Sequence, residues 1–206
     1  RGPPISTDFP NTTLLRSNQH EWQRIEFLRR ATREFENDPG IAKALSILDF
    51  EDYRDYPINV PQGNDIESTT FKVTNELLNQ ALGNHKARKG QKLHLDSLSP
   101  EAENHDSVMH RYYAETSVRD WFNQMLNGLE HFGYLVDSKA FSVYEVRPWL
   151  NYWVRLIADE NYRRNHNSRV YDQLYNYIYD EGFDGVKHLF DKLGHRILQS
   201  PYQDDD

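Results

Sequence analysis

Apolar side chains recur at intervals of three and four residues over most of this 206-residue sequence. This spacing places them on one face of an α-helix. The longest such pattern runs from Pro100 to Phe132 and predicts the longest helix, with Gly133 helping to end it. Its apolar positions are Val108, Tyr112, Val118, Trp121, Phe122, Met125, Leu126, Leu129 and Phe132.

Shorter patterns of the same kind predict the remaining helices. Asn18 is a candidate N-cap for a helix over 18–37, and Asp38 followed by Pro39 marks the start of a second helix. The other helices are expected over 69–83, 142–162, 169–181 and 183–198. Within the predicted helix 142–162, Pro148 either kinks the helix or moves its start to Arg147.

Two segments interrupt the helical pattern. Residues 51–68 contain two prolines and five acidic groups, and residues 84–100 are basic and then polar, so both are predicted to be long loops. The fold class predicted is all-α, a single irregular bundle of about six or seven helices. The organisation expected is an extended lead-in over 1–17, one helical domain over 18–200 and an acidic tail over 201–206.

Composition excludes several classes of function. The formal net charge is −8, and the one basic cluster, 85–92, falls in a predicted loop, so a nucleic-acid partner is not expected. The absence of cysteine excludes thiol catalysis, disulfides and cysteine-based metal sites. The sequence has no apolar run of about 18 residues and no signal-peptide pattern. No cofactor is expected, because the sequence contains no nucleotide-binding glycine motif.

One pattern points to metal chemistry. The His105-Asp106 doublet, with His110 nearby, is of the kind that metal-dependent phosphohydrolases use to hold divalent ions. The first ligand of such a site would be His85 or His94, and the last would be Asp137 or Asp159. The competing interpretation is that Asp106 complements the helix dipole in the first turns of a helix and pairs with His110 on an exposed face. No motif for a nucleophilic enzyme occurs in the sequence.

The aromatic residues of 147–179 are the most distinctive compositional feature. Two helices cannot bury all of them in one stripe, so we expect an outer face that suits a protein partner or a second copy of the chain. The alternative is that they form the rim of a tyrosine-rich core. The candidate interface residues are Trp149, Trp153, Arg155, Tyr175 and Tyr179.

Two blocks of the sequence, 22–52 and 125–157, resemble uncharacterised bacterial helical domains that follow an N-terminal transmembrane helix. The positions that match are Trp22, Phe27, Asn37, Ala42, Leu48, Asp49, Leu129, Phe132, Leu135, Val136, Val143 and Trp149. The resemblance covers about half of the chain, and the loops 51–68 and 84–100 depart from it. It implies a membrane anchor upstream of Arg1 and a cytoplasmic location, and it carries no catalytic residues.

These observations together predict a non-enzymatic helical domain. We expect it to be a protein-interaction or regulatory module of a membrane-tethered protein. The alternative is a metal-dependent phosphohydrolase-like enzyme built around His105 and Asp106.

Overall fold

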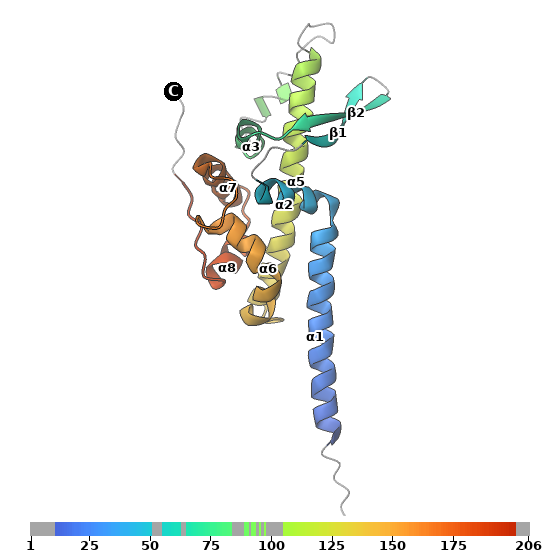
Figure 1. Cartoon of the computed structure of the whole chain (residues 1–206), viewed down its shortest axis with the longest axis vertical. Helices are drawn as coiled ribbons and strands as arrows, with labels where there is room; N and C mark the ends of the chain where they lie inside the picture. Colours follow the sequence, from blue (N-terminus) through green and yellow to red (C-terminus); the bar gives the residue numbers. More distant parts are fainter. Residues whose placement is uncertain are drawn as a thin grey trace, which may run out of the picture.

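The computed structural model is mostly helical, as predicted, and its described part holds seven helices and one two-stranded hairpin (Figure 1). The structure describes residues 11–50, 55–62, 65–83, 89–90, 92–93, 95, 97 and 105–200, with side chains from residue 19 onward. The predicted loop over 84–100 and the tail over 201–206 therefore lie mainly outside the described residues.

The elements follow one another along the chain. They are α1 (Asn11–Asn37), α2 (Pro39–Asp49), β1 (Asp55–Gln62), β2 (Asp65–Lys72), α3 (Asn75–Ala81), α5 (His105–Asp137), α6 (Val143–Ala158), α7 (Ser168–Asp180) and α8 (Asp184–Lys192). The strands β1 and β2 pair antiparallel, with Asp55 opposite Lys72 and Gln62 opposite Asp65.

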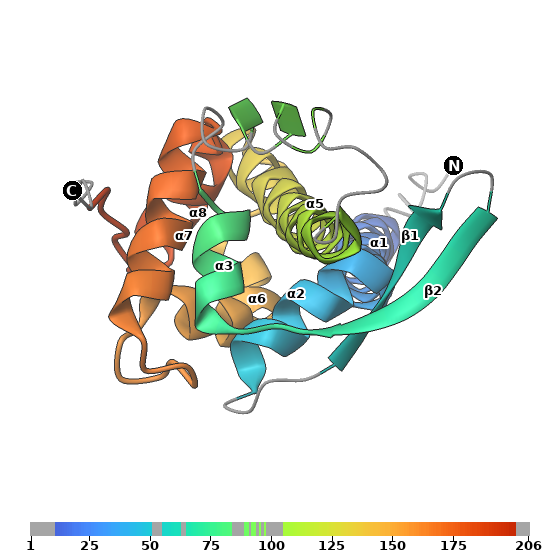
Figure 2. The same ribbon diagram turned by 90° about the horizontal axis from the view of Figure 1, so that it is seen from above.

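Helix α5 is the central element of the fold. Figure 2 looks almost along it: α3 and α7 lie on one side and the hairpin on the other. The helix has 33 residues and carries its buried side chains on a broad face. Those with no exposed surface are Val118, Phe122, Met125, Leu126 and Leu129. Since side chains from most other elements pack against this face, α5 carries the core of the whole domain.

Gly133 does not end the central helix, contrary to the prediction, because α5 continues to Asp137. Its role is to allow close packing with α8. A Cβ atom at Gly133 would lie 2.3 Å from the carbonyl oxygen of Gly185, and the Gly185 N–H donates to the Glu130 carboxylate at 3.1 Å. Both glycines therefore permit two backbones to approach more closely than any larger residue would allow.

Helix α1 begins at Asn11, so the predicted lead-in is wrong for residues 11–17, and Asn18 lies inside the helix. The sequence from Asn11 to Asn37 contains neither proline nor glycine, and nothing in it breaks the helix. The N-terminal half of α1 extends beyond the rest of the molecule (Figure 1). Contacts with the body begin near Arg24, which donates to Glu145 at 2.9 Å, and Phe27, which stacks on Phe141.

The hairpin corrects the prediction of a loop over 51–68 and of a helix starting near residue 69. Tyr56, Ile58 and Val60 alternate with exposed residues and are buried, which is the period of a half-buried strand. The loop was predicted because of Pro57 and Pro61, but both prolines lie at exposed positions of β1. In a sheet of two strands every strand has a free edge, and proline is tolerated there.

The later helices lie where they were predicted, but α6 ends at Ala158 and α8 at Lys192, short of the predicted ends at residues 162 and 198. Gly194, with a positive φ of 87°, follows the end of α8. Ser142 caps α6 in a capping box with Glu145, and the helix runs through Pro148, so it does not start at Arg147. Gly182 adopts a positive φ of 76° just after α7, as its predicted breaking role requires. Across the described helices, none has a stretch long and apolar enough to cross a membrane.

The contact between α5 and α8 makes a testable prediction. Gly133→Ala should destabilise the fold by about 1–3 kcal/mol, because its Cβ meets backbone that cannot move aside. In Gly40→Ala the new atom meets only the end of the flexible Gln124 side chain, so this second helical glycine is the matched control. Urea unfolding of both variants measures the difference. An equal or higher midpoint for Gly133→Ala would contradict the close approach.

Candidate functional site

The His105-Asp106 doublet lies at the start of the described part of α5. The His105 side chain is 17% exposed and the Asp106 side chain 81% exposed, with 3.3 Å between His105 Nδ1 and the Asp106 carboxylate. Asp106 thus lies in the first described turn, where its charge complements the helix dipole. The predicted partner of Asp106 was His110, but its hydrogen bond is with His105.

The doublet does not gain further metal ligands from the described residues. No group of three or more histidine, aspartate or glutamate side chains within the described ranges is arranged to hold a metal ion. Asp137 accepts from Lys192 and lies 3.3 Å from His188, and Asp159 accepts from Arg155 at 3.1 Å. His85 and His94 lie outside the described residues.

Tyr175 does not belong to an exposed aromatic face, and the interface prediction is wrong for this residue. It is 8% exposed, and its hydroxyl donates to the carbonyl oxygen of Ile157 at 2.9 Å. The guanidinium of Arg163 lies over the ring of Tyr171, 4.0 Å from its centroid, and also donates to the Tyr175 hydroxyl. Helix α7 packs against both α3 and α8, and Tyr175, although it lies off the main stripe, is buried.

Three other interface candidates also serve the domain itself. Trp149 packs against the core. The Tyr179 hydroxyl donates to the carbonyl oxygen of Ile197 at 3.1 Å and so holds the C-terminal segment against α7. The guanidinium of Arg155 lies over the ring of Tyr162, 4.1 Å from its centroid, and is paired with Asp159.

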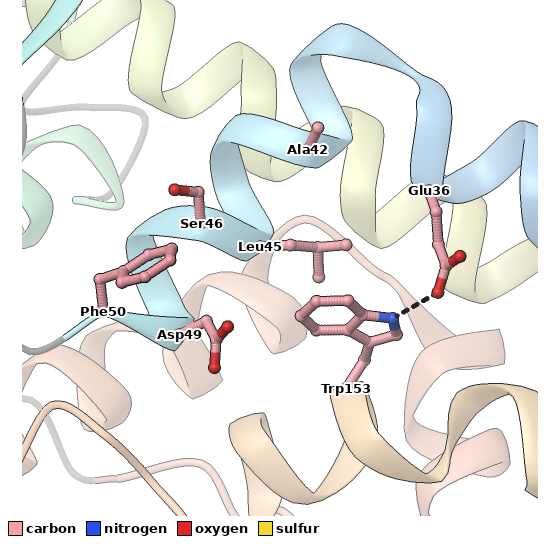
Figure 3. A pocket seen from close by; sticks show the side chains of 7 residues that line it. All are labelled: Glu36, Ala42, Leu45, Ser46, Asp49, Phe50 and Trp153. Carbon is pink, nitrogen blue, oxygen red and sulfur yellow. Dashed lines mark hydrogen bonds between the residues drawn. The ribbon is translucent and has the colours of Figure 1, made fainter.

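Trp153, the remaining candidate, forms one wall of a surface pocket of about 200 Å³ (Figure 3). We call it the Trp153 pocket. Its lining residues are Glu36, Ala42, Leu45, Ser46, Asp49, Phe50 and Trp153. Figure 3 shows the indole facing Leu45, with the carboxylates of Glu36 and Asp49 on either side of it. The pocket is therefore apolar at its centre and acidic at two edges.

A break between two helices positions these groups. Asp38 adopts an extended conformation before Pro39, and its carboxylate accepts from the Gly40 and Ile41 N–H groups at 2.9 and 3.0 Å. This N-cap confirms the predicted start of α2. It also turns the chain sharply, so that Glu36 at the end of α1 lies beside the face of α2 that meets α6.

Neutral donors hold both carboxylates of the Trp153 pocket. Trp153 Nε1–H donates to Glu36 at 3.2 Å, and the Tyr152 hydroxyl donates to Asp49. The rings of Tyr152 and Trp153 meet edge to face, with their centroids 4.6 Å apart. Among the described residues, neither Glu36 nor Asp49 forms an ion pair. Hydrogen bonds thus orient the two carboxylates, and no cation of the described residues is paired with either of them.

Tyr152 stays a neutral donor over the physiological pH range. Burial raises its pKa, the hydrogen bond to the Asp49 carboxylate raises it further, and the pKa reaches about 12. A phenolate at this position would lose part of its hydration and would lie beside the Asp49 carboxylate, so ionisation of Tyr152 is disfavoured. The proton therefore remains on Tyr152.

The lining of the Trp153 pocket favours binding over catalysis. None of its seven residues is a histidine, lysine or arginine, and its one hydroxyl, on Ser46, accepts a hydrogen bond from Tyr56 at 3.2 Å. Glu36 is exposed and Asp49 half-buried, so neither carboxylate has the dry surroundings that a general acid requires. An indole wall with two fixed acceptors is suited to hold and orient a ligand.

Sequence reasoning identified Trp153 but missed the α1 and α2 residues of the pocket. Ala42 and Asp49 entered only as positions of the sequence resemblance, and Glu36 had no distinguishing pattern. Only the predicted turn at Asp38-Pro39 gave a signal, since a break there brings the end of α1 beside α2. The contact of α2 with α6 joins residues over 100 positions apart, for example Asp49 and Tyr152.

Comparisons with known protein families, with curated proteins and with solved structures find no match for this chain.

The hydrogen bond between Tyr152 and Asp49 predicts a pH-dependent response. Asp49→Asn should lower the pKa of Tyr152 from about 12, because the phenolate would no longer face a carboxylate. The pKa should stay above the ordinary value, since burial of Tyr152 remains. Titration of 13Cζ-labelled tyrosine by NMR, with Tyr152→Phe for assignment, measures it.

The matched control is Asp106→Asn, a solvent-exposed carboxylate at the far end of α5. A Tyr152 pKa that responds equally to both substitutions, or to neither, would contradict the assigned hydrogen bond.

Proposed function

We propose that this chain is a non-enzymatic interaction module, and that the Trp153 pocket is the site where it recognises a partner. The observation that carries the proposal is the indole wall of Trp153 flanked by the two oriented carboxylates of Glu36 and Asp49. The sequence resemblance adds that the module acts within a membrane-tethered parent protein at the cytoplasmic face.

The size of the pocket favours a side chain over a whole small molecule. Its volume of about 200 Å³ is below the roughly 300–1,000 Å³ of typical small-molecule sites. Protein interfaces gain most of their affinity from a few anchor side chains inserted into such pockets, and tryptophan is enriched there. One inserted side chain of a partner therefore matches the geometry well.

A pocket-blocking substitution tests this proposal. Ala42 is exposed and lines the pocket, so Ala42→Phe fills it without removing any core side chain. Peptides selected from a random library on the wild-type chain should lose about tenfold in affinity for this variant, because their anchor is excluded. Isothermal titration calorimetry measures the affinities.

The matched control is Ala140→Phe, at an exposed alanine in the turn between α5 and α6. Trp153→Phe, which keeps an aromatic ring in the core contact, should weaken the peptides as well. If the selected peptides bind Ala42→Phe and Ala140→Phe equally, the Trp153 pocket is not the recognition site.

A second interaction is favoured by the projecting half of α1. Trp22 is 72% exposed and Ile25 47% exposed, and both continue the spacing by which Leu28 and Phe35 are buried against the body. The apolar stripe of α1 thus continues beyond the core of the domain, and such an exposed stripe is suited to pair with another helix. We propose that this stripe mediates self-association of the chain.

The self-association should be lost when the stripe is removed. Trp22→Ala with Ile25→Ala should weaken the dimer by about tenfold or more, since two exposed apolar anchors disappear on each copy. Sedimentation velocity over a concentration series measures the dissociation constant. The control pair Gln23→Ala with Glu26→Ala changes exposed polar residues of the same turn. A monomeric wild-type chain would refute the proposal.

A further inference from the structure

The charges around the Trp153 pocket say more about the chemistry of its ligand than the shape of the pocket does. Glu36 and Asp49 each accept from a neutral group, the indole of Trp153 and the phenol of Tyr152. A neutral glutamine or asparagine would accept these hydrogen bonds equally well. The carboxylates add two negative charges at the edges of an apolar pocket.

The described cations near the pocket make other contacts. Arg164, whose charge acts on Tyr152, lies 5.8 Å from the centroid of the Tyr162 ring. The ammonium group of Lys43 on α2 lies over the Trp121 ring, 4.6 Å from its centroid. Arg155 on α6 is paired with Asp159, 3.1 Å away, and Arg24 on α1 with Glu145. Within the described part of the chain, the carboxylates of the pocket therefore have no cation of their own.

The indole contributes to the same preference. The face of a tryptophan ring carries the negative part of its quadrupole and attracts cations more strongly than the rings of tyrosine or phenylalanine. Ala42 is exposed and offers apolar surface beside it, which suits an alkyl stem, and the buried Leu45 lines the same pocket. The combination of an aromatic face, an apolar surface and acidic edges matches a charged head group on a short hydrocarbon chain.

We propose that the Trp153 pocket binds an alkylammonium or alkylguanidinium group. This rests on the proposed function and names the chemistry of its ligand. The alkyl stem lies along Ala42 against the indole, and the charged head lies between the carboxylates of Glu36 and Asp49. A lysine or arginine side chain of a partner protein and a free small amine share this chemistry.

The first experiment compares charged and neutral probes of equal length. n-Butylammonium and n-butylguanidinium should shift the indole Nε1–H resonance of Trp153 in NMR spectra, because that group donates to Glu36. n-Butanol should bind about tenfold more weakly, since it lacks the charge. Binding of the cations should also weaken as salt is added. Equal binding of the alcohol overturns the proposal.

The second experiment removes the charges and keeps the hydrogen-bond acceptors. The double variant Glu36→Gln with Asp49→Asn should lose about tenfold in affinity for both cations and bind n-butanol unchanged. Glu26→Gln, an exposed carboxylate on the same helix as Glu36, is the control. Wild-type affinity for the cations in the double variant overturns the proposal.

The third experiment distinguishes the two sources of the ligand and separates the two proposals. A Gly/Ser peptide with one central lysine or arginine should bind more tightly than the free probe if the ligand is a partner side chain, and more weakly if it is a free amine. Either result supports a cationic ligand. If Ala42→Phe abolishes the binding of selected peptides whose anchor side chain is neutral, only the proposal of a cationic ligand is overturned. If Ala42→Phe leaves peptide binding unchanged, the Trp153 pocket is not the recognition site.

Discussion

The whole domain depends on the burial of one long helix. With 33 residues at about 1.5 Å per residue, α5 spans roughly 50 Å, and its broad apolar face cannot be covered by any single neighbour. The hairpin packs on its N-terminal half through Tyr56 and Phe71, which meet Trp121. Near its other end α8 approaches at Gly133, where the backbones almost touch. Each neighbouring element is thereby fixed relative to the others.

The Trp153 pocket is a consequence of this arrangement. Helices α2 and α6 both pack around the central helix, and the space left between their outer faces becomes the pocket. Burial of Leu45 and Leu48 fixes the rotation of α2, so Ala42 and Asp49 must lie toward α6. Because the core determines these positions, the two carboxylates flank the indole without any need for a flexible loop.

The sequence predicted what is local and missed what depends on distant contacts. Helical spacing and the cap at Asp38 identified most of the helices, because both are properties of neighbouring residues. Composition alone misassigned the hairpin: the prolines of β1 hid the alternation of Tyr56, Ile58 and Val60. The burial of Tyr175 and the role of Gly133 depend on the helix that packs opposite each of them. No periodicity within one segment reveals that partner.

Under the proposed function, the charges of the pocket would act mainly by excluding neutral and acidic partner side chains. When a partner side chain covers Glu36 and Asp49, both carboxylates lose water, and only a positive charge or several new hydrogen bonds offset that loss. A neutral apolar anchor would gain from the indole yet leave two desolvated charges beside it. Discrimination therefore comes from rejection of neutral and acidic partners as much as from attraction of basic ones. Under the proposed function, the net charge of −8 would act in the same direction at longer range, since it would draw cationic partners toward the surface.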